Sequence, residues 1–264
     1  MGLPLFDSTH DPGPSFVSLL QSSGVPLGAP SAEALSPHAT TVVALRFADG
    51  VVLAADRQAS MGYVASRDVR KIEPADRFTA VAISGTAATG LQMTRLLQVS
   101  FEHYEKMQDS SLSLEGKANY LSPIIQSINI GGPFVVLPLL AGWDVIHRRG
   151  RVFSYDGAGG CYERDDFTVI GSGTQFAEGV LRLGYRVDMN RDEALDLAAL
   201  AIYEAGDNDL ATGGPDFVRK IFPMMVTVTA EGFAEEVTDV VERRFRAILD
   251  RRTQTGGVAG GSLR

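Results

Sequence analysis

Few residues of this 264-residue chain could form a conventional pair of nucleophile and base. A serine or cysteine nucleophile usually relies on a histidine to take its proton. The four histidines are His10, His38, His103 and His147. The first two lie in a proline-rich N-terminal segment, the third falls in an expected helix, and the last precedes a turn-like Arg-Arg-Gly run. No histidine is therefore placed for a catalytic triad, and neither a Gly-x-Ser-x-Gly nor a Ser-x-x-Lys motif occurs.

The sequence also lacks the residues for an internal disulfide, a metal site or a phosphate-binding loop. The single cysteine, Cys161, cannot form an internal disulfide, has no cluster of metal ligands beside it, and is interpreted as a small residue at a turn after two glycines. The run 171–173 (GSG) has Phe176 where a Gly-x-Gly-x-x-Gly phosphate loop has its third glycine. We therefore expect neither a metal ion nor a cofactor.

Lysine usage is uneven, with 20 arginines but only four lysines. Arginine stays protonated, whereas the pKa of a buried lysine can be shifted strongly. We expect Lys106 and Lys117 to be solvated near helix ends, and Lys220 precedes a strand directly after an arginine. Lys71 lies between two predicted strands and could be the shifted lysine, although composition alone also fits a surface residue.

These candidates must be positioned by a well-patterned domain over residues 40–250. β-Branched runs at 40–47 and 51–57 flank a short turn containing glycine, which indicates a β-hairpin. Further strands are expected at 78–84, 134–141, 152–155, 167–170, 224–229 and 233–237, and helices at 86–107, 114–130, 174–185, 191–206 and 240–249. Asn190 and Glu193 have the spacing of a helix capping box. Strand runs alternate with helix pairs, which favours helices layered over antiparallel sheets, an α+β fold.

The two ends of the chain differ from this domain. Residues 1–39 hold six of the twelve prolines and no lysine or arginine, so we expect a poorly structured leader. Residues 251–264 include a glycine-rich stretch and are expected to form a flexible tail.

Charge and hydropathy exclude two classes of partner. The formal net charge of −8 leaves no basic surplus for nucleic acid. No apolar run reaches the roughly 18–20 residues that span a bilayer. Because the N-terminal apolar stretches have no basic residue before them and the chain has one cysteine, we expect a cytoplasmic protein.

Five short blocks, in order along the chain, resemble the proteasome β-subunit family. They are 39–45 (ATTVVAL), 50–57 (GVVLAADR) followed by the pair 70–71 (RK), 82–88 (AISGTAA), 169–173 (VIGSG) and 209–216 (DLATGGPD). The last is similar to the form seen in actinobacterial subunits. The resemblance covers about residues 40–250. It implies the N-terminal-nucleophile hydrolase fold, a four-layer αββα sandwich, and the activity of a threonine endopeptidase.

The resemblance also implies catalytic roles. Thr40 would be the nucleophile once residues 1–39 are removed at the bond between Ala39 and Thr40. Its free α-amine, with an unperturbed pKa of about 7.7–8.0, could then act as the base. Lys71 would place a cation beside Thr40, Asp56 would orient that lysine, and the Gly85 N–H would donate to the oxyanion.

Two further sets of residues carry over from the family. The polar group around the amine would consist of Ser172, Asp209 and Thr212. The specificity pocket would be lined by Ala59, Val69, Ile83 and Ala87. These four side chains are small or apolar, which favours cleavage after apolar residues.

The chain departs from the family pattern in a few places. Ala39 stands where glycine is usual, Gln58 where arginine is common, and Thr212 where eukaryotic subunits have serine. The interval from Thr40 to Lys71 is one residue shorter than usual, and we assign the deletion to the loop 61–66. None of these departures removes a core catalytic group.

The resemblance implies assembly into heptameric β rings flanked by rings of α-type subunits, with a ring-shaped ATPase that feeds in unfolded protein substrates. Gln58 also fits a bacterial two-ring ATP-dependent protease that resembles the proteasome core, but the long leader and the 209–216 loop count against it. A third alternative is a non-catalytic subunit of the same ring. Retention of Thr40, Asp56 and Lys71 counts against that alternative.

Overall fold

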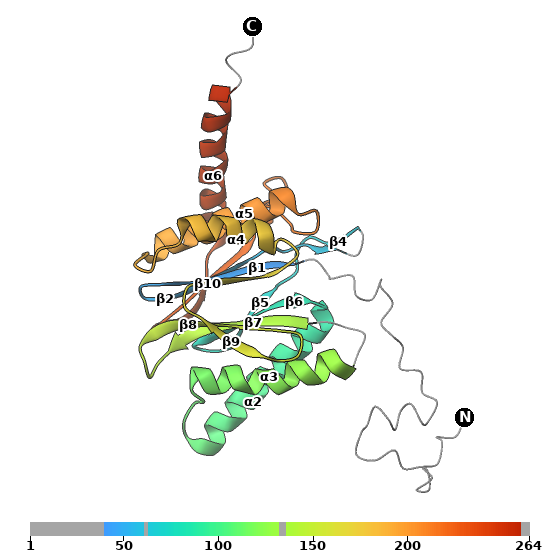
Figure 1. The fold of residues 1–264 in the computed structure, drawn as a ribbon, viewed down its shortest axis with the longest axis vertical. Coiled ribbons are helices and arrows are strands. Elements are labelled where there is room, and N and C mark those ends of the chain that lie inside the picture. Colours follow the sequence, from blue (N-terminus) through green and yellow to red (C-terminus); the bar gives the residue numbers. More distant parts are fainter. Residues whose placement is uncertain (1–39, 61–62, 132–135, 260–264) are drawn as a thin grey trace, which may run out of the picture.

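The computed structural model describes residues 40–60, 63–131 and 136–259, and these form two stacked antiparallel sheets (Figure 1). The first sheet has the order β10 (Phe167–Gly171), β1 (Thr41–Phe47), β2 (Gly50–Ala55), β11 (Met224–Thr229) and β12 (Gly232–Glu235). The second has the order β5 (Ile72–Asp76), β6 (Thr79–Gly85), β7 (Val136–Asp144), β8 (Arg149–Tyr155) and β9 (Cys161–Arg164). A two-stranded ribbon of β3 (Ala59–Ser60) and β4 (Val64–Ser66) follows β2.

Helices cover the outer face of each sheet. Helices α2 (Ala87–Gln108) and α3 (Leu114–Gly131) pack on the second sheet, and α4 (Thr174–Gly184) and α5 (Arg191–Asn208) pack on the first. The last helix, α6 (Thr238–Ala259), packs against α5. These layers confirm the predicted αββα sandwich. No helix within the described residues is long and apolar enough to cross a bilayer.

The core explains why the central strands are apolar on both faces. Along β1, Val42 and Ala44 belong to the cluster between the two sheets, whereas Val43 and Leu45 belong to the cluster under α4, α5 and α6. Successive side chains of a strand point to opposite faces, so a strand with a layer on each side must be apolar at every position. A third cluster lies between the second sheet and helices α2 and α3.

Local signals in the sequence explain where the prediction succeeded and where it missed strands. The capping box of α5 is confirmed, because the Asn190 side chain accepts from the Glu193 N–H and the Glu193 side chain accepts from the Asn190 N–H. Strands β5 and β9 were not predicted. Both are edge strands with charged residues, and β5 contains Pro74, which an edge strand tolerates. Cys161, expected at a turn, begins β9.

The expectation of a flexible tail from residue 251 is wrong for most of that segment, because α6 continues to Ala259. The first turn past the predicted end is held by Arg252, which pairs with Glu204 and Asp207 of α5 and lies over the Tyr203 ring. In Figure 1 the end of this helix (red) extends beyond the sandwich. The predicted leader, residues 1–39, and residues 260–264 lie outside the described residues.

Candidate active site

The candidate site lies where several strand ends meet at one edge of the sandwich. Thr40 precedes β1, and the ladder pairs Thr41 with Gly171 at the end of β10. The same ladder pairs Val42 with Ala55, the last residue of β2, so Asp56 follows beside the start of β1. The Asp56 N–H donates to the Thr41 carbonyl at 3.2 Å, and the Ser172 N–H donates to the Thr40 carbonyl at 3.1 Å. The antiparallel register thus places three distant segments around Thr40.

Asp56 and Lys71 form a buried ion pair. Lys71 Nζ lies 2.7 Å from Asp56 Oδ1 and 2.6 Å from the Gln58 carbonyl, and the two side chains are only 5% and 0% exposed. Asp56 Oδ1 also accepts from the Thr41 N–H, and its Oδ2 accepts from the Gln58 and Gly213 N–H groups. Burial lowers the pKa of Lys71, and the adjacent Asp56 carboxylate opposes that shift. A carboxylate with this many donors is fixed in position, and it fixes the ammonium.

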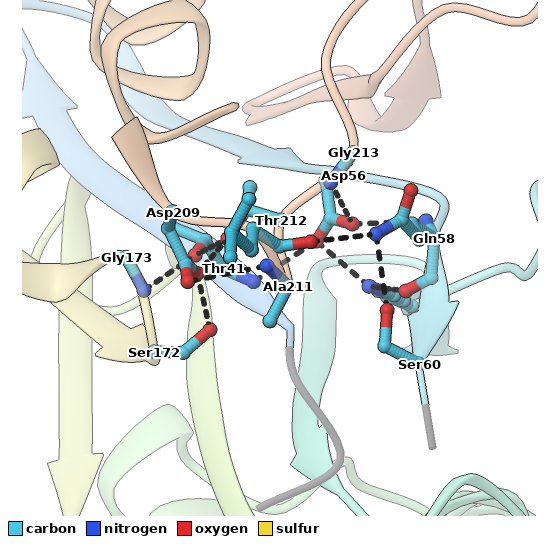
Figure 2. A network of polar contacts seen from close by, with 12 residues as sticks. Thr41, Asp56, Gln58, Ser60, Ser172, Gly173, Asp209, Ala211, Thr212 and Gly213 are labelled. Carbon is cyan, nitrogen blue, oxygen red and sulfur yellow. Dashed lines mark hydrogen bonds and ion pairs between the residues drawn. The ribbon is translucent and has the colours of Figure 1, made fainter. Parts of the chain in front are cut away.

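A second polar group joins the start of β1 to the loop after α5 (Figure 2). Ser172 Oγ and Thr212 Oγ1 both donate to Asp209 Oδ2, at 2.5 and 2.6 Å. Thr212 Oγ1 also lies 2.6 Å from Thr41 Oγ1, which accepts from the Gly173 N–H at 3.0 Å. Asp209 therefore joins the three polar residues that the resemblance implied, because it accepts from both hydroxyl groups.

A cavity of about 270 Å³ opens beside Thr40. Lys71 and Gly85 line it together with Thr40, and the four residues predicted for the specificity pocket form part of its wall: Ala59, Val69, Ile83 and Ala87. Arg70 and Glu73 also line it, which the sequence did not indicate. Arg70 Nε donates to Glu73 Oε1 at 3.2 Å, so the two charges pair and the wall stays mainly apolar.

Two glycines allow the backbone to take the shape that the site requires. Gly85, at the end of β6, has a φ of 109°, and Gly171 has a φ of 110°, values that side-chain-bearing residues rarely adopt. A Cβ on Gly171 would also lie 1.6 Å from the Thr40 carbonyl oxygen. Gly171 therefore permits the close approach of β10 to Thr40, and Gly85 forms part of the cavity wall.

The structure brings every predicted site residue within its described range to this edge. Besides Arg70 and Glu73, it adds Thr41, the Gln58 carbonyl and the Gly173 N–H, which the sequence did not indicate. Thr41 was not singled out because a β-branched residue is typical of any strand. The Gln58 carbonyl and the Gly173 N–H are backbone groups, so no side-chain type indicates them. Gln58, where arginine is common in the family, uses its side chain to donate to Ser60 and to the Leu210 carbonyl. Ala39, the other half of the predicted processing site, lies outside the described residues.

The expectation for Lys117 is wrong. It is buried, at 6% exposure, with Nζ 2.7 Å from Asp76 Oδ2 and 5.9 Å from the centre of the Phe101 ring. Two lysines are therefore buried in ion pairs, and lysine scarcity alone could not have chosen between them. Lys71 differs from Lys117 because it lines the cavity that Thr40 also lines.

This arrangement suits nucleophilic catalysis without histidine. Thr40 lines the same cavity as the buried Lys71 cation and Gly85, and its carbonyl accepts from the N–H of Ser172, a residue whose hydroxyl donates to Asp209. Among the described residues, no group of three or more His, Cys, Asp or Glu side chains could hold a metal ion. Burial raises the pKa of the Cys161 thiol, which keeps this cysteine in its unreactive form.

The chain is similar to known proteins over most of its length. Residues 36–219 match a family described as "Proteasome subunit". A proteasome subunit beta from Acidimicrobium ferrooxidans is 46% identical, with 97% of this chain and 96% of the relative covered. A proteasome subunit beta from Streptomyces griseus is 45% identical, with 83% of this chain and 79% of the relative covered. A third, from Frankia casuarinae, is 43% identical, with 83% and 82% covered.

Proposed function

Because the chain belongs to the proteasome β-subunit family, we propose that it is a catalytic subunit, a threonine endopeptidase that removes its own leader. The observation that carries this proposal is the buried Lys71–Asp56 pair, whose ammonium lines the same cavity as Thr40. Lys117 is also buried and pairs with Asp76, but Lys117 does not line this cavity. The place of the Lys71 ammonium on the cavity that Thr40 lines, and not burial alone, therefore supports chemistry at Thr40.

Maturation is the first reaction that we propose. The Thr40 hydroxyl attacks the carbonyl carbon of Ala39, and the acyl group moves from the Thr40 nitrogen to its oxygen, while the hydroxyl proton ends on the nitrogen. Water then hydrolyses the ester, which leaves a carboxylate on Ala39 and restores the hydroxyl of Thr40. The products are the leader, residues 1–39, and a chain that begins with a free α-amine.

Peptide hydrolysis follows the same course with an external substrate. The α-amine of Thr40 takes the hydroxyl proton, and the oxygen attacks the scissile carbonyl carbon. The peptide C–N bond then breaks, and the protonated α-amine gives its proton to the departing amine of the substrate, which leaves an acyl-enzyme. Water hydrolyses this ester, which releases the carboxylate product and restores the Thr40 hydroxyl. The Lys71 ammonium favours the neutral, basic form of the amine and stabilises charge that develops on the threonine oxygen. The Gly85 N–H donates to the oxyanion. Ser172 and Thr212 hold the amine through their hydroxyl groups.

Intact-mass measurement of the purified particle tests the proposal directly. We expect the chain to be lighter than its full sequence by the mass of residues 1–39, and a threonine-directed covalent inhibitor to label Thr40. Peptide mapping after labelling identifies the modified residue. Full-length chain in mature particles, or particles that remain unlabelled, would contradict the proposal and favour a non-catalytic ring subunit.

We further propose that the subunit cleaves after apolar residues. Replacement of Ala87 by phenylalanine fills the cavity beside Thr40, so kcat/KM for peptides with a large apolar residue before the cut should fall by about tenfold or more. Peptides with alanine at that position should lose much less. Gln92→Phe, five residues further along α2 and outside the cavity wall, is the matched control. Equal losses for both kinds of peptide would show that this cavity is not the specificity pocket.

Membership in this family implies assembly with other proteasome subunits. We propose the specific arrangement of heptameric β rings flanked by α-type rings and served by a ring-shaped ATPase in the cytoplasm. Large apolar side chains that are highly exposed in the single chain support such contacts. They include Leu183, Leu210 and Val218, at 93%, 99% and 91% exposure.

A further inference from the structure

Thr41, the residue after the proposed nucleophile, links the two polar groups of the site. Its side chain is fully buried. Its N–H donates to Asp56 Oδ1 at 2.9 Å, the oxygen that also accepts from Lys71. Its hydroxyl contacts the other group, 2.6 Å from the hydroxyl of Thr212. Thr41 therefore contacts Asp56, which pairs with Lys71, and Thr212, whose hydroxyl is proposed to hold the α-amine (Figure 2).

The hydrogen bonds through Thr41 run in one direction. At one end the Gly173 N–H can only donate, and it donates to Thr41 Oγ1. At the other end Thr212 gives its single proton to Asp209. Thr41 must therefore donate its own proton to Thr212, because a hydroxyl has one proton and two lone pairs. The chain of donors runs from Gly173 through Thr41 and Thr212 to Asp209.

This direction determines what remains free on Thr212. Thr212 donates its proton to Asp209 and accepts from Thr41 with one lone pair. Its second lone pair is therefore left to accept one further hydrogen bond. Ser172 likewise gives its proton to the same oxygen of Asp209. The turn that carries Ser172 is tied to Thr41 through the Gly173 N–H. The hydroxyl of Thr41 thus holds both acceptors in place.

We propose that Thr41 is a positioning residue, whose hydroxyl orients Thr212 and the 171–173 turn so that their remaining lone pairs accept from the α-amine of Thr40. This inference rests on the proposed function, because the amine exists only after residues 1–39 are removed. Thr41 acts through its neighbours and does not touch the substrate. We therefore expect Thr41 to affect the rate of the chemical step and not substrate binding.

Replacement of Thr41 by valine keeps the shape and removes the hydroxyl. With the full chain produced in its assembled particle, we expect kcat to fall about 10- to 100-fold with KM nearly unchanged, because a small misplacement of reacting groups is costly. Thr41→Ser retains the hydroxyl and should restore most of kcat. Thr79→Val is the matched control, since Thr79 is also fully buried and accepts from the buried Lys117 on the other sheet. That control should leave kcat unchanged.

The outcomes separate this inference from the proposed function. An active wild type with Thr41→Val at wild-type kcat overturns the inference and leaves the proposed function intact. A wild type without turnover overturns both. If Thr41→Val does not assemble, Thr41→Ala, which also lacks the hydroxyl, takes its place, and a normal kcat for that variant overturns the inference. Equal losses in Thr41→Val and Thr41→Ser also overturn it, because only the first lacks the hydroxyl.

Discussion

Replacement of Thr40 by alanine is expected to abolish peptide hydrolysis and to leave residues 1–39 attached. The hydroxyl oxygen is the attacking atom in both proposed reactions, and loss of a nucleophile leaves only the contribution of binding and of the oxyanion donor. We expect kcat to fall by at least about 10³-fold. Fluorogenic peptide turnover and the intact mass of the same preparation measure the two effects together. Thr40→Ser retains an oxygen nucleophile and should keep measurable activity.

A matched control separates chemistry from packing. Thr227 lies in β11 of the same sheet and is 3% exposed, close to the 5% of Thr40. Thr227→Ala removes the same atoms from an equally buried threonine, and it should be processed and active. Undiminished turnover in Thr40→Ala would disprove the assignment of the nucleophile. Loss of activity in both variants would point instead to damaged assembly.

The second large effect is expected at Lys71. Methionine in its place keeps a flexible apolar stem and removes the charge that lines the cavity beside Thr40. Because a buried charge aimed at the reacting atoms acts in a poorly screened environment, we expect kcat/KM to fall about 10²- to 10³-fold or more. Arginine should not restore activity, because the site holds the ammonium at 2.6 and 2.7 Å from two oxygens within a buried space.

Lys117 supplies the control for this variant. It is as buried as Lys71, at 6% exposure each, and it also pairs with an aspartate, but on the other side of the second sheet. Lys117→Met therefore breaks a comparable buried pair and should lower the melting temperature without lowering kcat. Similar activity losses in the two variants would mean that Lys71 acts only through stability.

The same pair predicts a change in pH dependence. Burial lowers the pKa of Lys71 and Asp56 opposes that shift, so Asp56→Asn should lower the pKa further. The lysine then loses its proton at a lower pH, and the alkaline limb of the kcat profile should move to lower pH. The measurement is kcat against pH for the wild type and the variant. An alkaline limb that does not move would show that Asp56 has another role.

Periodic patterns predicted most of the fold. Central strands buried on both faces, such as β1 and β11, have continuous apolar runs, and helix α5 carries its capping box in the sequence. The edge strands β5 and β9 were missed because charged residues interrupt both of them, and Pro74 also interrupts β5, which weakens the periodic signal. The length of α6 was missed for a different reason. Its last turns depend on Arg252 and partners on α5, about 45 residues away, a contact that no local pattern encodes.

Side-chain chemistry and family resemblance predicted the candidate site only in part. Thr40, Asp56 and Lys71 could be named because the family carries these residue types within the sequence blocks that this chain resembles. Composition alone could not, as the burial of Lys117 demonstrates. Thr41 was missed because its hydroxyl acts through contacts with Gly173 and Thr212, which become neighbours only when the sheet has formed. Tertiary pairing, and not sequence spacing, creates that part of the site.

The register of β1 has a consequence for activation. The ladder begins at Thr41, and the Thr40 carbonyl is already held by the Ser172 N–H, so the bond before Thr40 lies outside the β-ladder hydrogen bonds of the described residues. Cutting that bond changes the connectivity of the chain and leaves its pairing intact. Under the proposed function, this strand pairing is already formed before residues 1–39 are removed. Their removal would then create the α-amine without any change in the β-ladder that positions Thr40.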